Sequence, residues 1–268
     1  MKTPPTDPLS YASYLKVEEL LSLQRPLSNP MAHDEMLFIV IHQVYELWFK
    51  LILFELESVN QKLEIGDILS SFHGLDRICE VMKILVQQID VLETMTPTDF
   101  NRFRSNLNPA SGFQSLQFRE LEILSGASAE EYEKFSKLMP EWRDKISRRS
   151  KTSSLKSAFI GLLQRQGLLE VKATADQITR AVLKVYQGSD RVALRDLCER
   201  LLRFDEQFQL WRFRHVQMVE RMIGMKPGTG GSLGVAYLSQ TLKRRFFTEL
   251  WEARTLMGDP DSYGASKK

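Results

Sequence analysis

The chain has little cysteine and almost no net charge. Its two cysteines, Cys79 and Cys198, lie far apart in segments with helical apolar spacing, so they cannot build a disulfide framework or a thiolate zinc cluster. We interpret them as reduced core thiols of a cytosolic protein. The 36 Lys and Arg residues nearly balance the 34 Asp and Glu residues, which leaves a net charge of +2. No global basic field therefore indicates nucleic acid or an anionic membrane as a partner.

A secretion signal and an uninterrupted apolar run are also missing. The N-terminus has three prolines among its first eight residues and no apolar core of a signal peptide. The most apolar stretch, 36–56, is interrupted at helical spacing by His42, Glu46, Lys50 and Glu55. We expect a buried or half-buried helix there rather than a bilayer span, and a cytoplasmic protein.

Apolar residues recur at helical spacing, whereas strand-like alternation and Asn-Gly hairpin signals are absent. A short helix is predicted after Thr96, a good N-cap, and Asn108-Pro109 ends it. The segment 142–156, rich in serine and arginine, is expected to be a polar surface connection. The other predicted helices span 37–56, 78–92, 114–124, 129–138, 158–165, 174–187 and 192–223. The predicted fold class is all-α, a helical bundle.

Two of the four histidines lie on apolar helix faces. His42 shares its face with Phe38, and His215 shares its face with Trp211 and Met218. Each could be a satisfied core residue. Both lie on long helices that can pack around one cavity, however, and one axial imidazole facing a second, non-ligating histidine is a workable haem site. Zinc is disfavoured because no His, Cys or carboxylate stands three or four residues after His215 and no HExxH motif exists.

The short helix after Thr96 carries two arginines on nearly opposite faces, since two residues rotate a helix by about 200°. Arg104 shares its face with Phe100 and Phe103, whereas Arg102 does not. A guanidinium beside two aromatic rings either stays solvated at the surface or pairs with an anion such as a substrate carboxylate. Spacing alone leaves both interpretations open for Arg104.

The segment 226–234 has four glycines but lacks the P-loop pattern. Its backbone N–H groups and the hydroxyls of Thr229 and Ser232 could bond the ammonium and carboxylate of an amino acid. A flexible helix connection is the alternative.

At the level of motifs, the chain resembles the tryptophan 2,3-dioxygenases over nearly its whole length. The matching stretches are YASYL (11–15), HDEMLFI (33–39), HQVYELW (42–48), LETMT (92–96), FR (103–104), SGFQSLQ (111–117), QLWRFRH (209–215) and GTGGS (228–232). The resemblance implies an all-helical enzyme with haem b as cofactor and O₂ as co-substrate. It also implies that His215 is the proximal ligand of the haem iron.

The resemblance implies roles for further residues at the site. His42 would be the distal histidine near the indole nitrogen of the substrate, and Arg104 would clamp the carboxylate. Thr229 would bind the ammonium and carboxylate groups from a closing loop. Phe38 and Phe100 would line the indole pocket. The remaining cofactor contacts implied are Ser111 and Gly112 at the haem edge, with Trp211 beside the proximal histidine.

The family pattern also implies a homotetramer. Tyr11, Tyr14 and Leu15 match an arm, residues 1–15, that reaches the active site of a neighbouring subunit. Residues 16–257 would form a single catalytic domain, and 258–268 a disordered tail. Two positions depart from the family: Leu233 follows the Gly-Gly-Ser run where Ser is usual, and Phe100 stands where some members have Tyr.

The expected activity is insertion of both atoms of O₂ across the indole C2–C3 bond of L-tryptophan, giving N-formylkynurenine. A relative that inserts one oxygen atom and forms an oxindole from a substituted tryptophan is the alternative. A non-catalytic haem or tryptophan sensor is a third possibility. The sequence leaves the three open.

Overall fold

The computed structural model describes residues 8–128, 139–229 and 234–258, and within these ranges the chain is helical and has no strand, which confirms the all-α prediction. The predicted helix at 129–138 and the predicted tail beyond 258 lie outside the described residues. The α-helices in chain order are α1 (Tyr11–Leu15), α2 (Val17–Leu21), α3 (His33–Glu64), α4 (Ile68–Leu92), α5 (Pro97–Phe103), α6 (Leu116–Ser125), α8 (Arg143–Ser150), α9 (Leu155–Arg165), α10 (Ala175–Gln187), α11 (Val192–Ile223), α12 (Val235–Thr241) and α13 (Thr248–Thr255). Short 3₁₀ turns are η1 (Arg104–Leu107), η2 (Gly112–Gln114) and η3 (Pro140–Trp142).

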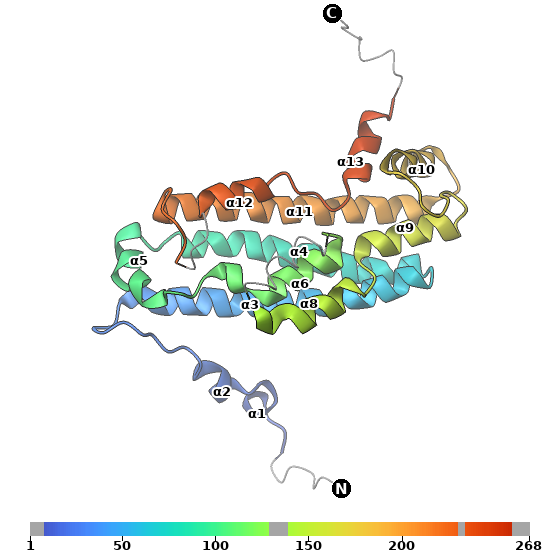
Figure 1. Cartoon of the computed structure of the whole chain (residues 1–268). Coiled ribbons are helices and arrows are strands. Elements are labelled where there is room, and N and C mark those ends of the chain that lie inside the picture. The colour runs from blue at the N-terminus through green and yellow to red at the C-terminus, as the bar shows by residue number, and fades with distance from the viewer. Residues whose placement is uncertain (1–7, 129–138, 230–233, 259–268) are drawn as a thin grey trace, which may run out of the picture.

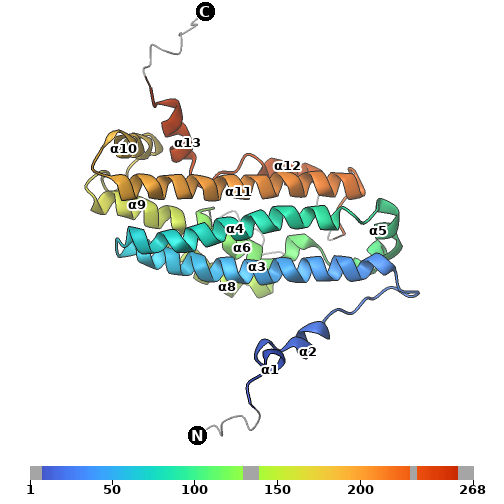
Figure 2. The same ribbon diagram turned by 180° about the vertical axis from the view of Figure 1, so that it is seen from behind.

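Three long helices, α3, α4 and α11, form the body of the molecule (Figure 1, Figure 2). α4 packs between the other two. It runs antiparallel to α3, since Tyr45 bonds the Leu85 carbonyl whereas Glu55, further along α3, pairs with Arg77, earlier in α4. It runs parallel to α11, since Arg200 and Arg214 pair with Asp76 and Asp90 in the same order along both helices. This arrangement puts α3 and α11 on opposite sides of a common neighbour.

Helix boundaries follow local signals in the sequence. The bounds of α11 are those predicted from its apolar spacing. α4 begins at Ile68 rather than at residue 78, because the Asp67 side chain caps its first turn by accepting from the Ser70 N–H. Leu75, in this additional part of the helix, is completely buried. Thr96 caps α5 through the Asp99 N–H, as predicted.

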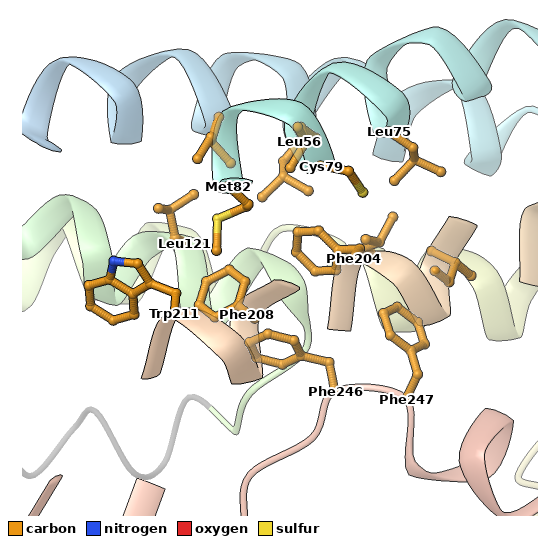
Figure 3. Packing of buried hydrophobic residues seen from close by; sticks show 14 of the residues in the cluster. Leu56, Leu75, Cys79, Met82, Leu121, Phe204, Phe208, Trp211, Phe246 and Phe247 are labelled. Atoms are coloured by element: carbon orange, nitrogen blue, oxygen red, sulfur yellow. The ribbon is translucent and has the colours of Figure 1, made fainter. Parts of the chain in front are cut away.

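The shorter helices cover one side of this body. α6 and α9 pack on α3, α12 packs on α11, and α10 pairs with α13 at one end. A continuous apolar core lies between these layers (Figure 3). Its largest fully buried side chains include Phe204 and Phe208 of α11, Met82 of α4 and Phe247 before α13. Both cysteines are completely buried and free, as expected.

The prediction of a loop at 142–156 is wrong. Residues Arg143–Ser150 form α8, which packs on α6. Trp142 and Ile146, one helical turn apart, bury their side chains against Ile123 in a small second core. Arg149 pairs with Glu57 of α3 and with Glu120 of α6. Two apolar anchors and a double ion pair therefore stabilise a helix in a segment whose composition is polar.

The N-terminal arm contains the short helices α1 and α2 and extends away from the body (Figure 1). Its root is fixed to the start of α3 by Glu35, whose buried carboxylate accepts from the backbone N–H groups of Leu27 and Ser28. α3 is the one described helix long and apolar enough to cross a membrane. Its packing against α4, α6 and α9 identifies it as a core helix of the bundle.

Gly74 allows α3 and α4 to pack closely, because a Cβ at this position would lie 2.7 Å from Val59 Cγ2. We expect Gly74→Ala to lower the free energy of unfolding by about 1–3 kcal/mol through overpacking. Gly161→Ala is the matched control, since its Cβ would meet only the guanidinium Nη1 of Arg165, at 3.3 Å. It should be neutral or stabilise α9 by up to about 1 kcal/mol. Urea unfolding of both variants checks this, and equal effects would contradict it.

Candidate active site

One cavity of about 520 Å³ opens among α3, α5, α6, α11 and α12. Its volume is typical of a site for a small molecule or cofactor. The structure brings nine of the residues predicted for the site to its wall. They are Phe38, His42, Phe100, Arg104, Ser111, Gly112, Trp211, His215 and Thr229. Tyr11, Tyr14 and Leu15 do not line it and lie exposed on the arm.

His215 borders the cavity from α11. Its ring stacks on Trp211, one turn earlier, with ring centroids 5.0 Å apart and planes 7° from parallel. Phe118 of α6 lies against the Trp211 ring at 4.8 Å. The buried indole Nε1 of Trp211 has no hydrogen-bond partner among the described residues. Desolvation, together with the nearby His42 and Arg119, lowers the pKa of His215 to about 4. The imidazole is therefore neutral near pH 7 and can act as a ligand for a metal.

His42 borders the cavity from α3. Its Nδ1 lies 2.7 Å from the Phe38 carbonyl oxygen, and because a carbonyl can only accept, Nδ1 carries the proton and donates. Desolvation lowers the pKa of His42, so that the ring is neutral. Nε2 is then an acceptor. The ring also lies 4.1 Å from Phe38, which packs on Phe100 at 5.8 Å.

Arg104 and Thr229 lie at the same end of the cavity and hold the glycine-rich segment to the wall. Arg104 Nη2 donates to the Pro227 carbonyl over 2.7 Å. The Thr229 hydroxyl donates to the Ala110 carbonyl over 2.6 Å. Arg102 lies outside the cavity and pairs with Asp99. The structure separates the two arginines as the helical-face argument predicted, whereas Ser232 and Leu233 lie outside the described residues.

Sequence reasoning missed a buried ionic group in the cavity wall. Glu122 of α6, 1% exposed, accepts from Arg119 at 2.7 Å and from Arg212 of α11 at 2.9 Å. Arg212 also donates to the Arg244 carbonyl at 2.7 Å. The i,i+3 spacing of Arg119 and Glu122 was a visible signal. The partnership with Arg212 joins residues far apart in the chain and has no local signature.

The cavity places two neutral histidines and Arg104 on one wall. The family model described as tryptophan 2,3-dioxygenase matches residues 5–166 and 161–257. The chain belongs to the tryptophan 2,3-dioxygenase family. A tryptophan 2,3-dioxygenase of Herpetosiphon aurantiacus is 46% identical over 257 residues, covering 92% of this chain and 97% of the relative. That of Nocardioides sp. is 44% identical over 254 residues, covering 92% and 94%.

A third relative in the tryptophan 2,3-dioxygenase family comes from Anaeromyxobacter sp. strain K. It is 43% identical over 261 residues, which cover 92% of this chain and 95% of the relative. The similarity therefore extends across every element that lines the cavity. Within the described residues, no group of three or more His, Cys, Asp or Glu side chains could hold a metal ion by itself.

The depressed pKa of His215 links the stability of the ligand-free protein to pH. The folded pKa of about 4 lies below the ordinary 6.5, so the unfolded state takes up the proton first as pH falls. The stabilisation present above pH 6.5 is lost progressively down to about pH 4. Relative to His215→Gln, the free energy of unfolding should fall by about 3 kcal/mol over this window. Parallel pH profiles of the two proteins in urea would contradict the assignment.

Proposed function

We propose that the protein is a haem-dependent tryptophan 2,3-dioxygenase, converting L-tryptophan and O₂ to N-formylkynurenine in tryptophan catabolism. The observation that carries the proposal is the pair of neutral histidines, His42 and His215, that two helices place on the wall of one apolar cavity. Membership of the tryptophan 2,3-dioxygenase family supports dioxygenation of tryptophan as the reaction at this pair. The relatives described above carry the dioxygenase name, and nothing in the described residues favours the oxindole-forming alternative.

The residues on the wall fit haem b. His215 offers a neutral imidazole held in one plane by Trp211, and the aromatic lining suits a porphyrin face. The unpartnered Nε1 of Trp211 could donate to a polar group of a bound cofactor. Ser111 and Gly112 would lie along the haem edge. When bound, the haem supplies the activation of O₂, and the protein supplies binding and orientation.

The indole end of tryptophan would lie between aromatic walls. Phe38 and Phe100 offer apolar faces on which an indole can pack. His42 Nε2, the acceptor of a neutral ring, would receive the indole N–H and so set the orientation of the ring. This role requires a hydrogen-bond acceptor and no transfer of a proton.

The amino-acid end would be held by Arg104 and Thr229. The Arg104 guanidinium donates to the neutral Pro227 carbonyl in the protein alone. A substrate carboxylate can replace that carbonyl because a charged acceptor bonds a guanidinium more strongly. Binding of substrate would thus exchange one hydrogen bond of the glycine-rich segment for a stronger one at the same arginine.

The proposed enzyme is a cytoplasmic homotetramer. Tyr11 and Tyr14 of the arm are 78% and 71% exposed. Large exposed aromatic side chains next to each other are typical of a contact surface. We propose that they and Leu15 complete the substrate site of a neighbouring subunit, as the family pattern implies.

The decisive experiment is aerobic incubation of the ferrous haem-loaded protein with L-tryptophan and isotope-labelled O₂, followed by mass spectrometry. We expect a product that carries both labelled atoms. A product with one labelled atom would instead identify the oxindole-forming chemistry. Absence of turnover at full haem occupancy would overturn the proposal and favour a non-catalytic haem or tryptophan sensor.

The two histidines should respond differently to substitution. His215→Ala should abolish stable haem binding while the fold stays helical, because the axial protein ligand is lost. His42→Ala should retain haem and lose part of the turnover, because it removes a hydrogen-bond partner of the substrate. Soret absorbance during haem titration and circular dichroism distinguish the two. An unchanged Soret spectrum in His215→Ala would refute the ligand assignment.

The two arginines provide a matched pair. Arg104→Leu should raise KM for tryptophan and lower kcat/KM, because a charge-assisted contact with the carboxylate is lost. The loss of transition-state stabilisation should be about 2–4 kcal/mol. Arg102→Leu, which removes a solvated arginine paired with Asp99 over 3.8 Å, should change both values little. Steady-state kinetics with tryptophan checks the comparison. Equal losses in the two variants would remove Arg104 from the site.

A further inference from the structure

The segment 110–117 connects η1 to the first turn of α6 along the cavity. Each of its residues from 110 to 115 lines the cavity wall. Within the segment, the Ser111 N–H donates to Gln114 Oε1 over 3.2 Å, and the Ser111 hydroxyl accepts from the Phe113 N–H over 3.3 Å. These bonds are local. They give the segment its shape but do not determine where it lies relative to the helices that carry the histidines.

Hydrogen bonds at the two ends of this segment attach it to other parts of the wall. At its start, the Ala110 carbonyl accepts from the Thr229 hydroxyl over 2.6 Å. At its end, Gln117 Nε2 donates to the backbone carbonyl of Glu46 over 2.9 Å and to the Glu46 carboxylate over 2.7 Å. The segment therefore links the glycine-rich segment to α3. We call the pair of Glu46 and Gln117 the brace.

The brace meets α3 next to the distal side of the site. Glu46 follows His42 by one helical turn, and both residues line the cavity. Because Gln117 bonds the main chain and the side chain of the same residue, it has little freedom to shift along the helix. The bond to the carboxylate is charge-assisted and therefore stronger than a bond between two neutral groups. The brace thus holds the end of the segment at one level of α3, beside His42.

We propose that Glu46 is a positioning residue of the site. Through Gln117 it holds the segment 110–117 in place beside His42, and so sets both the fit of the cofactor edge and the anchor point of the glycine-rich segment. Sites are held in their productive geometry by supporting hydrogen bonds of this kind. The inference rests on the proposed function, because it concerns the cofactor edge and the amino-acid end of the same site. Glu46 acts through Gln117 and need not touch substrate or cofactor.

The first experiment exchanges the two side chains of the brace. Gln117→Glu places two carboxylates against each other, whereas the double variant Glu46→Gln/Gln117→Glu again sets an amide against a carboxylate, in reverse order. Gln61→Glu, at an exposed position of α3, is the control of equal charge. Hydrogen–deuterium exchange of the full chain as purified reports local opening of residues 110–117. We expect exchange there to be about tenfold faster or more in Gln117→Glu, largely restored in the double variant, and unchanged in Gln61→Glu.

The second experiment measures cofactor and substrate in the same haem-loaded variants. Haem transfer to excess apomyoglobin should be about tenfold faster or more from Gln117→Glu than from wild type. KM for tryptophan should rise in the same variant, because the anchor of the glycine-rich segment shifts. A purely structural loss would lower the number of active molecules, and so the apparent kcat, without changing KM. The double variant should recover both haem retention and KM.

Gln117→Ala guards against misfolding of the charged variant. It removes the donor without adding a charge, so it should change exchange, haem transfer and KM in the same direction by a smaller factor. Circular dichroism establishes that each variant is folded.

Three results would overturn the inference. The first is exchange and haem transfer in Gln117→Glu and Gln117→Ala equal to those of Gln61→Glu. The second is a double variant no better than Gln117→Glu, and the third is a fall in kcat at unchanged KM. A wild type that neither retains haem nor converts tryptophan would refute the proposed function instead. Exchange at 110–117 would still decide whether the brace holds the segment.

Discussion

The site depends on two long helices that are held apart by a third. α4 packs against both α3 and α11, and α3 reaches α11 through large aromatic side chains, with Tyr45 and Phe49 set edge-on to Trp211. Tyr45, Phe49 and Trp211 also line the cavity, so the rings that join the two helices form part of its wall. His42 lies one helical turn after Phe38, and His215 lies one turn after Trp211. Residues one turn apart share a helix face, so each histidine lines the cavity together with its aromatic neighbour.

This packing also determines where charge can lie. In an apolar cavity the neutral form of an imidazole is favoured, so desolvation lowers the pKa of both histidines. The charges that remain in the wall are compensated within it, as Glu122 bonds both Arg119 and Arg212. Arg104 lies at the edge and bonds only a neutral carbonyl in the contacts described. Arg104, at the edge of the cavity, is therefore the position best able to bind a new anion.

Local signals explain what could be predicted from the sequence. The bounds of α11 follow from an apolar pattern unbroken by Gly or Pro, and the separation of Arg104 from Arg102 follows from helical rotation. α8 was not predictable in this way, because its stability comes from Trp142 and from ion pairs with α3 and α6, which are distant in the chain. The Glu122 and Arg212 pair is hidden for the same reason: charged residues are expected at the surface unless their partners are known.

α3 explains why composition alone is ambiguous here. A helix with one apolar face in the core and another on the outside has the hydropathy of a membrane span, although Glu46, Lys50 and Glu55 interrupt its apolar sequence. Its first turns combine three tasks. Glu35 fixes the root of the arm, Phe38 and His42 face the cavity, and Met36 begins the exposed apolar face. Any shift of this segment along its axis would move the root of the arm and His42 together, so the arm and the cavity wall share one helical support.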